Sequence, residues 1–422
     1  MNQELGDHMK KIFTLIFLWI PLLVSAQAFS LASLSDQKAA WNIEVGEDFW
    51  NIKTSATDLS PAIQPRSYLF LPDSQTQWAY KNPHTEIKIV GMEPITQYLR
   101  FNMKFRADQE FGAKLDELAL DYVVSPSWGF RVGVVDYKTT WCQTYDVDSP
   151  WIVAPSLACS SREFVDTSGG APGVQSYVNL DLSQNYNLQA LVGIYNPLVL
   201  NYASDEFAQW IPSPQYQVKK NNKLGGSLNL FNTWTGTEYR VSWLHSQQSA
   251  YSPESNFLAT TDQSTDLIYA GVNFALNGQA QLQLTRTQQY LSNDCTAVYQ
   301  EKCGDLKDTR STNTIKLLYH FTNKDVLGAS YSRHQISSQL GINAGSGITW
   351  DNDFYRENHN GWGLAWRHQW TPQVFTAVQL QLADQSLGYS PSKYADWGVP
   401  TNTGMFNSSG SALGVRLAYR FN

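Results

Sequence analysis

Apolar and polar positions alternate with a period of two, segment after segment, from about residue 95 to the C-terminus. This period is typical of β-strands that turn one face to an apolar medium and the other to a polar one, and no helical period of comparable length occurs. Residues 411–422 show it most clearly. One face carries Leu413, Val415, Leu417, Tyr419 and Phe421, and the other carries Ala412, Gly414, Arg416, Ala418 and Arg420. The pattern predicts an all-β chain.

Very short turns alternate with long polar loops between these segments. The turns fall at 125–127, 183–185, 235–236, 277–278, 322–324 and 371–372, and the loops at 137–172, 196–221, 248–265, 291–311, 336–359 and 385–410. This rhythm is typical of a transmembrane, antiparallel, up-and-down β-barrel with periplasmic turns and extracellular loops. Aromatic residues at the turns and the chain end predict a ring at the periplasmic interface: Trp128, Trp234, Phe321, Trp370 and Phe421.

The strand count depends on how the N-terminal part is interpreted. Counting from Ile95 gives fourteen strands, and residues 95–422 belong to the barrel in either interpretation. The stretches 40–53 and 85–90 also alternate, and including them gives sixteen. Residues 29–94 are therefore either the first two strands or a plug or periplasmic extension. We expect sixteen strands.

The first 28 residues read as a secretory signal peptide. Met9, Lys10 and Lys11 give the positive start, residues 12–24 give the apolar core, and residues 26–28 (AQA) give a small-x-small cleavage site. Residues 1–8 precede this second methionine, so they are either an N-terminal extension or untranslated. Export predicts the outer membrane of a Gram-negative cell, with both termini of the barrel in the periplasm.

Composition narrows the choice of function. Charged residues make up 16% of the chain and aromatic residues 13%, while the mean hydropathy is −0.34. A secreted soluble all-β protein is the alternative on composition alone, but a barrel between lipid and water fits better. The net charge of −7 argues against a nucleic-acid partner. The sequence shows neither a Ser/His/acid set nor a pattern for a cofactor, so we expect no enzyme and no cofactor.

The four cysteines form two pairs that are close in sequence. Cys142 and Cys159 fall in the loop 137–172, and Cys295 and Cys303 fall in the loop 291–311. No His or Cys completes a zinc pattern around them, so no metal site is expected. Because export permits disulfides, we expect two local bridges that each close one loop.

The inner face follows from the position of charge. In the strand 98–106, Arg100, Asn102 and Lys104 alternate with large apolar residues. Charge on the lipid face costs about 2–4 kcal/mol near mid-membrane, so the charged face points inward. The same rule predicts these pore-lining residues: Arg100, Lys104, Arg106, Glu117, Asp121, Arg131, Asp181, Arg240, Lys316, Arg367, Arg416 and Arg420.

These inward charges allow two interpretations. If the last strand meets the first, Arg416 and Arg420 come close to the bases of the early strands and make one wall basic. A basic wall facing acidic residues sets up a field that sorts solutes by charge. Alternatively, the inward bases and acids pair with one another and rigidify the wall.

The loop 137–172 is the candidate constriction because it is the longest. Its candidate constriction residues are Trp141, Asp146, Asp148 and Trp151. Folding into the lumen explains its length, and covering the outer mouth explains it equally well.

The chain resembles the porin-like outer-membrane proteins of Gram-negative bacteria. Residues 417–421 (LAYRF) look like their C-terminal strand, which ends in an aromatic residue and is recognised by the barrel-assembly machinery; Asn422 is an addition to that pattern. Residues 128–133 (WGFRVG) and 149–155 (SPWIVAP) are similar to the WxxLRxGR strand and YPW…PP loop of phosphate-selective-type porins and their relatives. Ser149 stands in place of the tyrosine, and Ala154 in place of the first proline. The resemblance implies sixteen strands and uptake of anions or other small solutes.

We therefore expect a channel for passive diffusion of small hydrophilic solutes, with anion preference as one option. Its other expected partners are outer-membrane lipid, lipopolysaccharide and the barrel-assembly machinery. Trimers are common among such porins, so a homotrimer is open to this chain, although no flat apolar patch decides the matter. The rival functions are a transporter plugged by residues 29–94 and a structural or secretion-associated barrel whose loops bind a partner.

Overall fold

The computed structural model describes most of the chain. The described residues are 40–56, 84–108, 112–137, 141, 149–152, 170–195, 217–251, 260–298, 302–343, 348–389 and 405–421. No helix long and apolar enough to cross a membrane occurs within these ranges. The predicted signal peptide, residues 1–28, lies outside the described residues.

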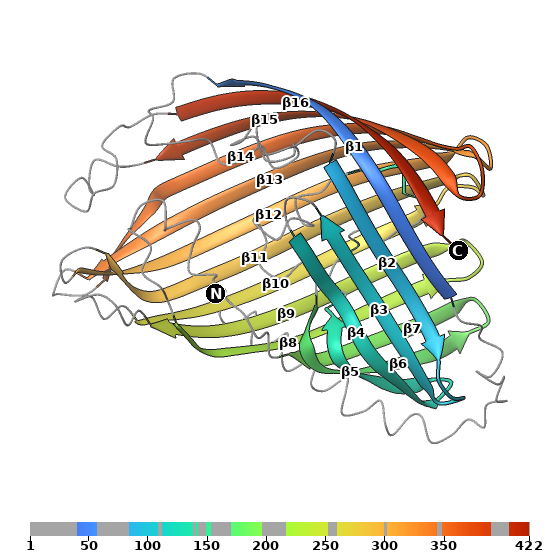
Figure 1. Cartoon of the computed structure of the whole chain (residues 1–422). Helices are drawn as coiled ribbons and strands as arrows, with labels where there is room; N and C mark the ends of the chain where they lie inside the picture. The colour runs from blue at the N-terminus through green and yellow to red at the C-terminus, as the bar shows by residue number, and fades with distance from the viewer. Residues whose placement is uncertain are drawn as a thin grey trace.

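Sixteen antiparallel strands close into one barrel, in which β1 pairs with both β2 and β16. Figure 1 shows β1 running beside β16 where the wall closes. The strands are β1 (Ala40–Ala56), β2 (His84–Pro94), β3 (Leu99–Asp108), β4 (Gly112–Ser125), β5 (Trp128–Asp136), β6 (Gly170–Ser183), β7 (Tyr186–Tyr195), β8 (Gln217–Asn232), β9 (Thr237–Tyr251), β10 (Thr260–Ala275), β11 (Ala280–Val298), β12 (Lys302–His320), β13 (Asp325–Asn343), β14 (Ile348–Gln369), β15 (Val374–Tyr389) and β16 (Met405–Phe421). The predicted sixteen-strand barrel is confirmed.

The N-terminal stretches complete the wall. Both alternating stretches before residue 95 became strands, β1 and β2, and β2 pairs in turn with β3. The described part of residues 29–94 therefore belongs to the barrel wall, while residues 57–83 lie outside the described ranges.

Burial divides each strand into two faces, as β16 illustrates. Leu413 and Leu417 are 46% and 56% exposed, whereas Arg416 between them is 4% exposed. Leucines can face outward and arginines inward only if the surroundings are apolar and the interior is polar. Strand alternation therefore assigns the outer face to lipid and the inner face to the lumen.

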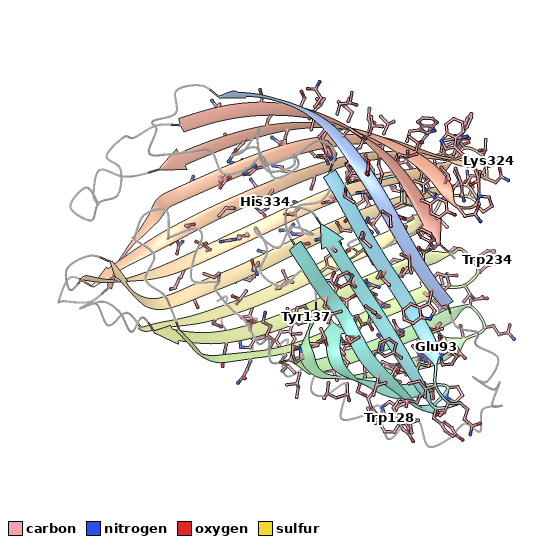
Figure 2. The ribbon with its side chains drawn as sticks, in the orientation of Figure 1. Glu93, Trp128, Tyr137, Trp234, Lys324 and His334 are labelled. Atoms are coloured by element: carbon pink, nitrogen blue, oxygen red, sulfur yellow. The ribbon has the colours of Figure 1, made fainter. Side chains whose placement is uncertain are left out.

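The short turns fall at one end of the barrel, where the sequence places them. The two residues 126–127 separate β4 from β5, and residues 184–185 separate β6 from β7. Trp128 and Trp234 lie at this end, as Figure 2 shows, together with Lys324 of another turn.

The barrel wall is uneven in height. Strands β2–β7 have 9 to 14 residues, whereas β11–β14 have 19 to 22. The tall strands correct the predicted loops 291–311 and 336–359, most of whose residues extend β11–β14. A strand that continues beyond the membrane has water on both faces, so its polar residues do not show the alternation that marks a strand within the bilayer.

Candidate functional site: the barrel lumen

The strand register places every predicted pore-lining residue on the inner face. Arg416 is paired with Asp48 and with Ala377, and the same inward row continues from strand to strand around the barrel. Most of the predicted set is buried or half-buried, whereas Asp181, near the short turns, is exposed. Its Oδ1 accepts a hydrogen bond from Nδ2 of Asn187 at 2.7 Å.

Arg416 ties the last strand to the first two. Its Nε and Nη2 donate to the two carboxylate oxygens of Asp48 at 2.6 and 2.7 Å, and Nη2 also donates to Glu86 at 2.6 Å. Four residues further along β16, Nη2 of Arg420 donates to Oε2 of Glu44 at 3.3 Å. The point of barrel closure is therefore held by buried, bidentate ion pairs as well as by backbone hydrogen bonds.

Asp121 is the centre of a second ion-pair cluster. Its carboxylate accepts hydrogen bonds from Nη2 of Arg100 at 2.8 Å and from Nε of Arg131 at 3.4 Å. The hydroxyl of Tyr177 donates to its other oxygen at 2.8 Å. Asp121 is 1% exposed, so three donors compensate for the cost of burying its charge.

Lys104 forms ion pairs with two further acids. Its Nζ lies 2.7 Å from Oδ2 of Asp136 and 3.2 Å from Oε2 of Glu117. Arg106 lies 3.9 Å from Glu86, at the edge of the Arg416 cluster. Bases and acids thus alternate over the inner face of β16 and β1–β6, which we name the charged wall. Of the two interpretations of the inward charges, the contacts favour pairing over a separate basic wall.

The remaining predicted bases lie elsewhere on the inner face. Nε of Arg240 on β9 donates to Asn229 at 2.7 Å. The guanidinium of Arg367 on β14 lies 4.4 Å from the ring centroid of Phe375. Lys316 on β12 is buried.

Uncharged polar side chains predominate on the inner face of β10–β15, which we name the amide–hydroxyl wall. Its buried members include Thr265, Gln283, Thr287, Gln289, Thr312, Thr314, Ser330, Ser332, Gln379, Gln381 and Gln385. The hydroxyls of Thr314 and Ser332 are 2.8 Å apart, and that of Thr312 lies 2.7 Å from Nδ1 of His334. His334, labelled in Figure 2, lies on the tall part of the wall, which also contains Asp308, Arg310, Glu357 and His359.

The described residues of the loop after β5 contact this wall at two places. The ring of Trp141 makes an edge-to-face contact with the ring of Tyr269 of β10, with centroids 6.0 Å apart. The guanidinium of Arg240 lies 5.1 Å from the centroid of the Trp141 ring. The backbone N–H of Ile152 donates to Oε1 of Gln379 on β15 at 2.8 Å. Because Tyr269, Arg240 and Gln379 all face inward, these parts of the loop lie inside the lumen.

The indole of Trp151 lies against two glycines, a position that we name its seat. A Cβ at Gly328 of β13 would lie 2.7 Å from Cζ2 of this indole, and one at Gly363 of β14 would lie 3.1 Å from Cζ3. Real Cβ atoms essentially never show the first distance, and the second is tighter than most of their contacts, so glycine at both positions lets the ring lie against the strands. Sequence reasoning missed Gly328, Gly363, Gln379 and Tyr269, since only the register shows that they face the loop.

For several predicted site residues the structure describes no side chain. Asp146, Asp148, Cys142 and Cys159 lie outside the described residues. Cys295 and Cys303 belong to β11 and β12, which corrects their placement in a loop, and their side chains are not among those described. Both disulfides stay predictions. Among the described residues, no group of three or more His, Cys, Asp or Glu is arranged to hold a metal ion.

No protein-family model and no curated protein sequence matches the chain. Similar solved structures include the anion-selective porin from Comamonas acidovorans, at 13% identity and a TM-score of 0.48, covering 90% of this chain and 99% of that one. The outer membrane channel DcaP of Acinetobacter baumannii matches at 8% identity and a TM-score of 0.46, covering 91% of this chain and 97% of that one. OprB of Pseudomonas putida matches at 11% identity and a TM-score of 0.46, covering 92% of this chain and 100% of that one.

Proposed function

We propose that this chain is an outer-membrane channel through which small hydrophilic solutes diffuse passively. The observation that carries the proposal is the inner face of the barrel, which is polar or charged on nearly every strand. Barrels of 16 to 18 strands are wide enough to hold an aqueous channel. Arginine, glutamine and threonine side chains lose free energy of hydration when they are packed without water, so an inner face made of them favours a water-filled lumen.

In this proposal the loop 137–172 is the constriction. Its support is the pair of contacts inside the lumen, Trp141 against β10 and Ile152 against β15. Strands β10 and β15 are separated by four others around the wall, so the loop narrows the lumen between its two contacts. The predicted Asp146 and Asp148 fall between these contacts in the sequence and are proposed to line the narrowed part.

The orientation and partners complete the proposal. The short turns and both termini of the mature chain face the periplasm, the long connections face the exterior, and residues 1–28 direct export. The outer face contacts lipid and lipopolysaccharide, and the C-terminal strand is recognised by the barrel-assembly machinery. A homotrimer is the proposed assembly, supported by the sequence resemblance to porins, and chemical crosslinking of intact outer membranes tests it.

Planar-bilayer recording of the purified protein tests the channel. We expect stepwise insertion of ohmic conductances that persist at low voltage. A barrel that folds, as judged by its heat-modifiable migration in a detergent gel, but conducts nothing at any voltage contradicts the proposal.

Charge selectivity is tested separately with Arg100→Glu. The inward bases motivate a modest anion preference, and reversing one at the Asp121 cluster adds negative charge to the wall. We expect the reversal potential in a salt gradient to shift toward cation selectivity, and Arg106→Glu, at a partly exposed position of the same wall, to act in the same direction. An unchanged reversal potential in both variants removes these residues from selectivity and leaves them a structural role.

A further inference from the structure

The outer face of the tall strands β11–β14 changes from apolar to polar within one step of the strand register. The last apolar row that these strands turn outward consists of Leu284, Ile315, Tyr331 and Trp362. The next outward row, further from the short turns, consists of Arg286, Asn313, Arg333 and Asn360. Because lipid tails exclude polar side chains, this change marks the edge of the hydrocarbon region on these four strands.

Two arginines in the first polar row lie close together on the outside of the barrel. Arg286 of β11 and Arg333 of β13 are both exposed, and both are paired in register with Asn313 of β12. Two interstrand spacings, about 10 Å, therefore separate their backbones. Within the described part of the chain neither guanidinium has an ion-pair or hydrogen-bond partner. Both side chains are long enough to reach one group that lies over Asn313.

The bases on the outer face are gathered on these four adjacent strands. Among the described side chains, the strands turn four bases outward, which we name the outer basic belt: Arg286, Lys307, Arg333 and Arg356. Beyond the last apolar row, no described outward side chain of β11–β14 is acidic. The bordering acids are Asp266 of β10, whose Oδ1 lies 2.8 Å from Nδ1 of His245, and Asp384 of β15. The belt is thus locally positive on a chain whose net charge is −7.

The position and chemistry of the belt indicate the kind of group that it binds. Basic side chains at the surface of a membrane attract anionic lipid head groups. A guanidinium binds phosphate through two parallel N–H bonds, which gives it a preferred geometry as well as charge. The rings of Tyr331 and Trp362, with centroids 4.5 Å apart, lie just below the arginine row, and aromatic residues are typical of the membrane interface.

We propose that Arg286 and Arg333, with Asn313 between them, bind a phosphate group of the lipopolysaccharide in the outer leaflet. This inference rests on the proposed orientation in the outer membrane and gives the proposed lipid partner a defined site. The acyl chains of the glycolipid lie along the apolar rows below, and its phosphate lies at the arginine row. Lys307 and Arg356 lie nearer the exterior, at the level of further anionic groups of the same molecule.

Fluorescently labelled lipid A, the phosphorylated anchor of lipopolysaccharide, is the probe. It is titrated into purified full-length protein in detergent, and binding is followed by fluorescence anisotropy. We expect saturable binding by the original protein. In Arg286→Gln and in Arg333→Gln the dissociation constant should rise about tenfold, as expected for the loss of one charge-assisted contact. The double variant should bind more weakly than either single variant, and lipid A without its phosphates should bind weakly to all of them.

Two further variants separate a defined site from a general effect of charge. Lys324→Gln removes one exposed positive charge from a short turn at the opposite end of the barrel, where Figure 2 labels Lys324, and should leave the dissociation constant unchanged. Arg333→Lys keeps the charge but loses the paired N–H groups, so its dissociation constant should lie between those of the original protein and Arg333→Gln.

Three outcomes overturn the site. They are equal affinity of the original protein and the double variant for lipid A; equal affinity of the original protein for lipid A with and without phosphates; and an equal loss in Lys324→Gln, which means that net charge alone governs binding. Each variant is first shown to be folded by its heat-modifiable migration. The double variant should keep the conductance of the original protein because both arginines lie outside the lumen. A barrel that binds lipid A but never conducts contradicts the proposed channel and leaves the lipid site standing.

Discussion

The two walls of this barrel solve the problem of buried polarity in different ways. On the charged wall, bases and acids of neighbouring strands satisfy one another, as Arg416 does with Asp48 and Glu86. On the amide–hydroxyl wall, neutral groups pair in part, and some, such as Thr287 and both amide atoms of Gln381, have no partner within the described residues. The first arrangement joins neighbouring strands mainly by ion pairs, and the second relies mainly on neutral hydrogen bonds.

The walls also differ in height and in what they carry. The charged wall includes the short strands β2–β6, whereas the amide–hydroxyl wall includes the longest strand, β14 with 22 residues. The loop after β5 starts beside the charged wall, yet its described residues contact the inner face of β10 and β13–β15. We propose that the charged wall is the scaffold and that the amide–hydroxyl wall, with the loop, faces the solute.

The largest effect is expected at the point of barrel closure. Arg416→Met leaves Asp48 and Glu86 buried without their counter-charge, so we expect the free energy of unfolding to fall by about 3–5 kcal/mol. Urea unfolding in lipid vesicles, followed by tryptophan fluorescence, measures it. Adding Asp48→Asn and Glu86→Gln to Arg416→Met should recover much of the loss. A triple variant as unstable as the single one contradicts the ion-pair explanation.

A smaller effect is expected where the loop contacts the tall wall. Gly363→Leu places a side chain where the ring of Trp151 lies, and overpacking of this kind costs about 1–3 kcal/mol. The indole should leave its seat, and the single-channel conductance should rise because the loop no longer narrows the lumen. Gly278→Leu, in the short turn between β10 and β11 where a Cβ would meet nothing within 4 Å, is the control. Unchanged conductance in Gly363→Leu means that this contact does not limit flow.

The smallest effect is expected within the amide–hydroxyl wall. Thr314→Val removes one neutral hydrogen bond to Ser332, whose hydroxyl keeps its bond to the backbone carbonyl of Asn313, so the loss of stability should be about 1 kcal/mol. The same urea unfolding experiment compares it directly with Arg416→Met. If Thr314→Val costs as much as Arg416→Met, the proposed division between a scaffold wall and a solute-facing wall is wrong.

The sequence alone was enough to predict the barrel, its strand number and its two faces. In a membrane strand the side chains alternate strictly, and lipid excludes charge, so Leu417 and Arg416 cannot exchange faces. The same rule put Arg100 and Lys104 on the inner face. It failed for residues 291–311, where the strands extend into water and alternation no longer marks them.

Only the tertiary structure decided which inward groups meet. Arg416 and Asp48 are 368 residues apart in the chain, and their contact exists because the last strand closes on the first in one register. The seat of Trp151 likewise depends on two glycines brought together by the pairing of β13 with β14, and the unpaired amide of Gln381 lies beside it through the pairing of β14 with β15. Periodicity along a strand fixes a side chain's face, but its neighbours depend on strand register and on where a loop folds back, which are set by packing across the whole barrel.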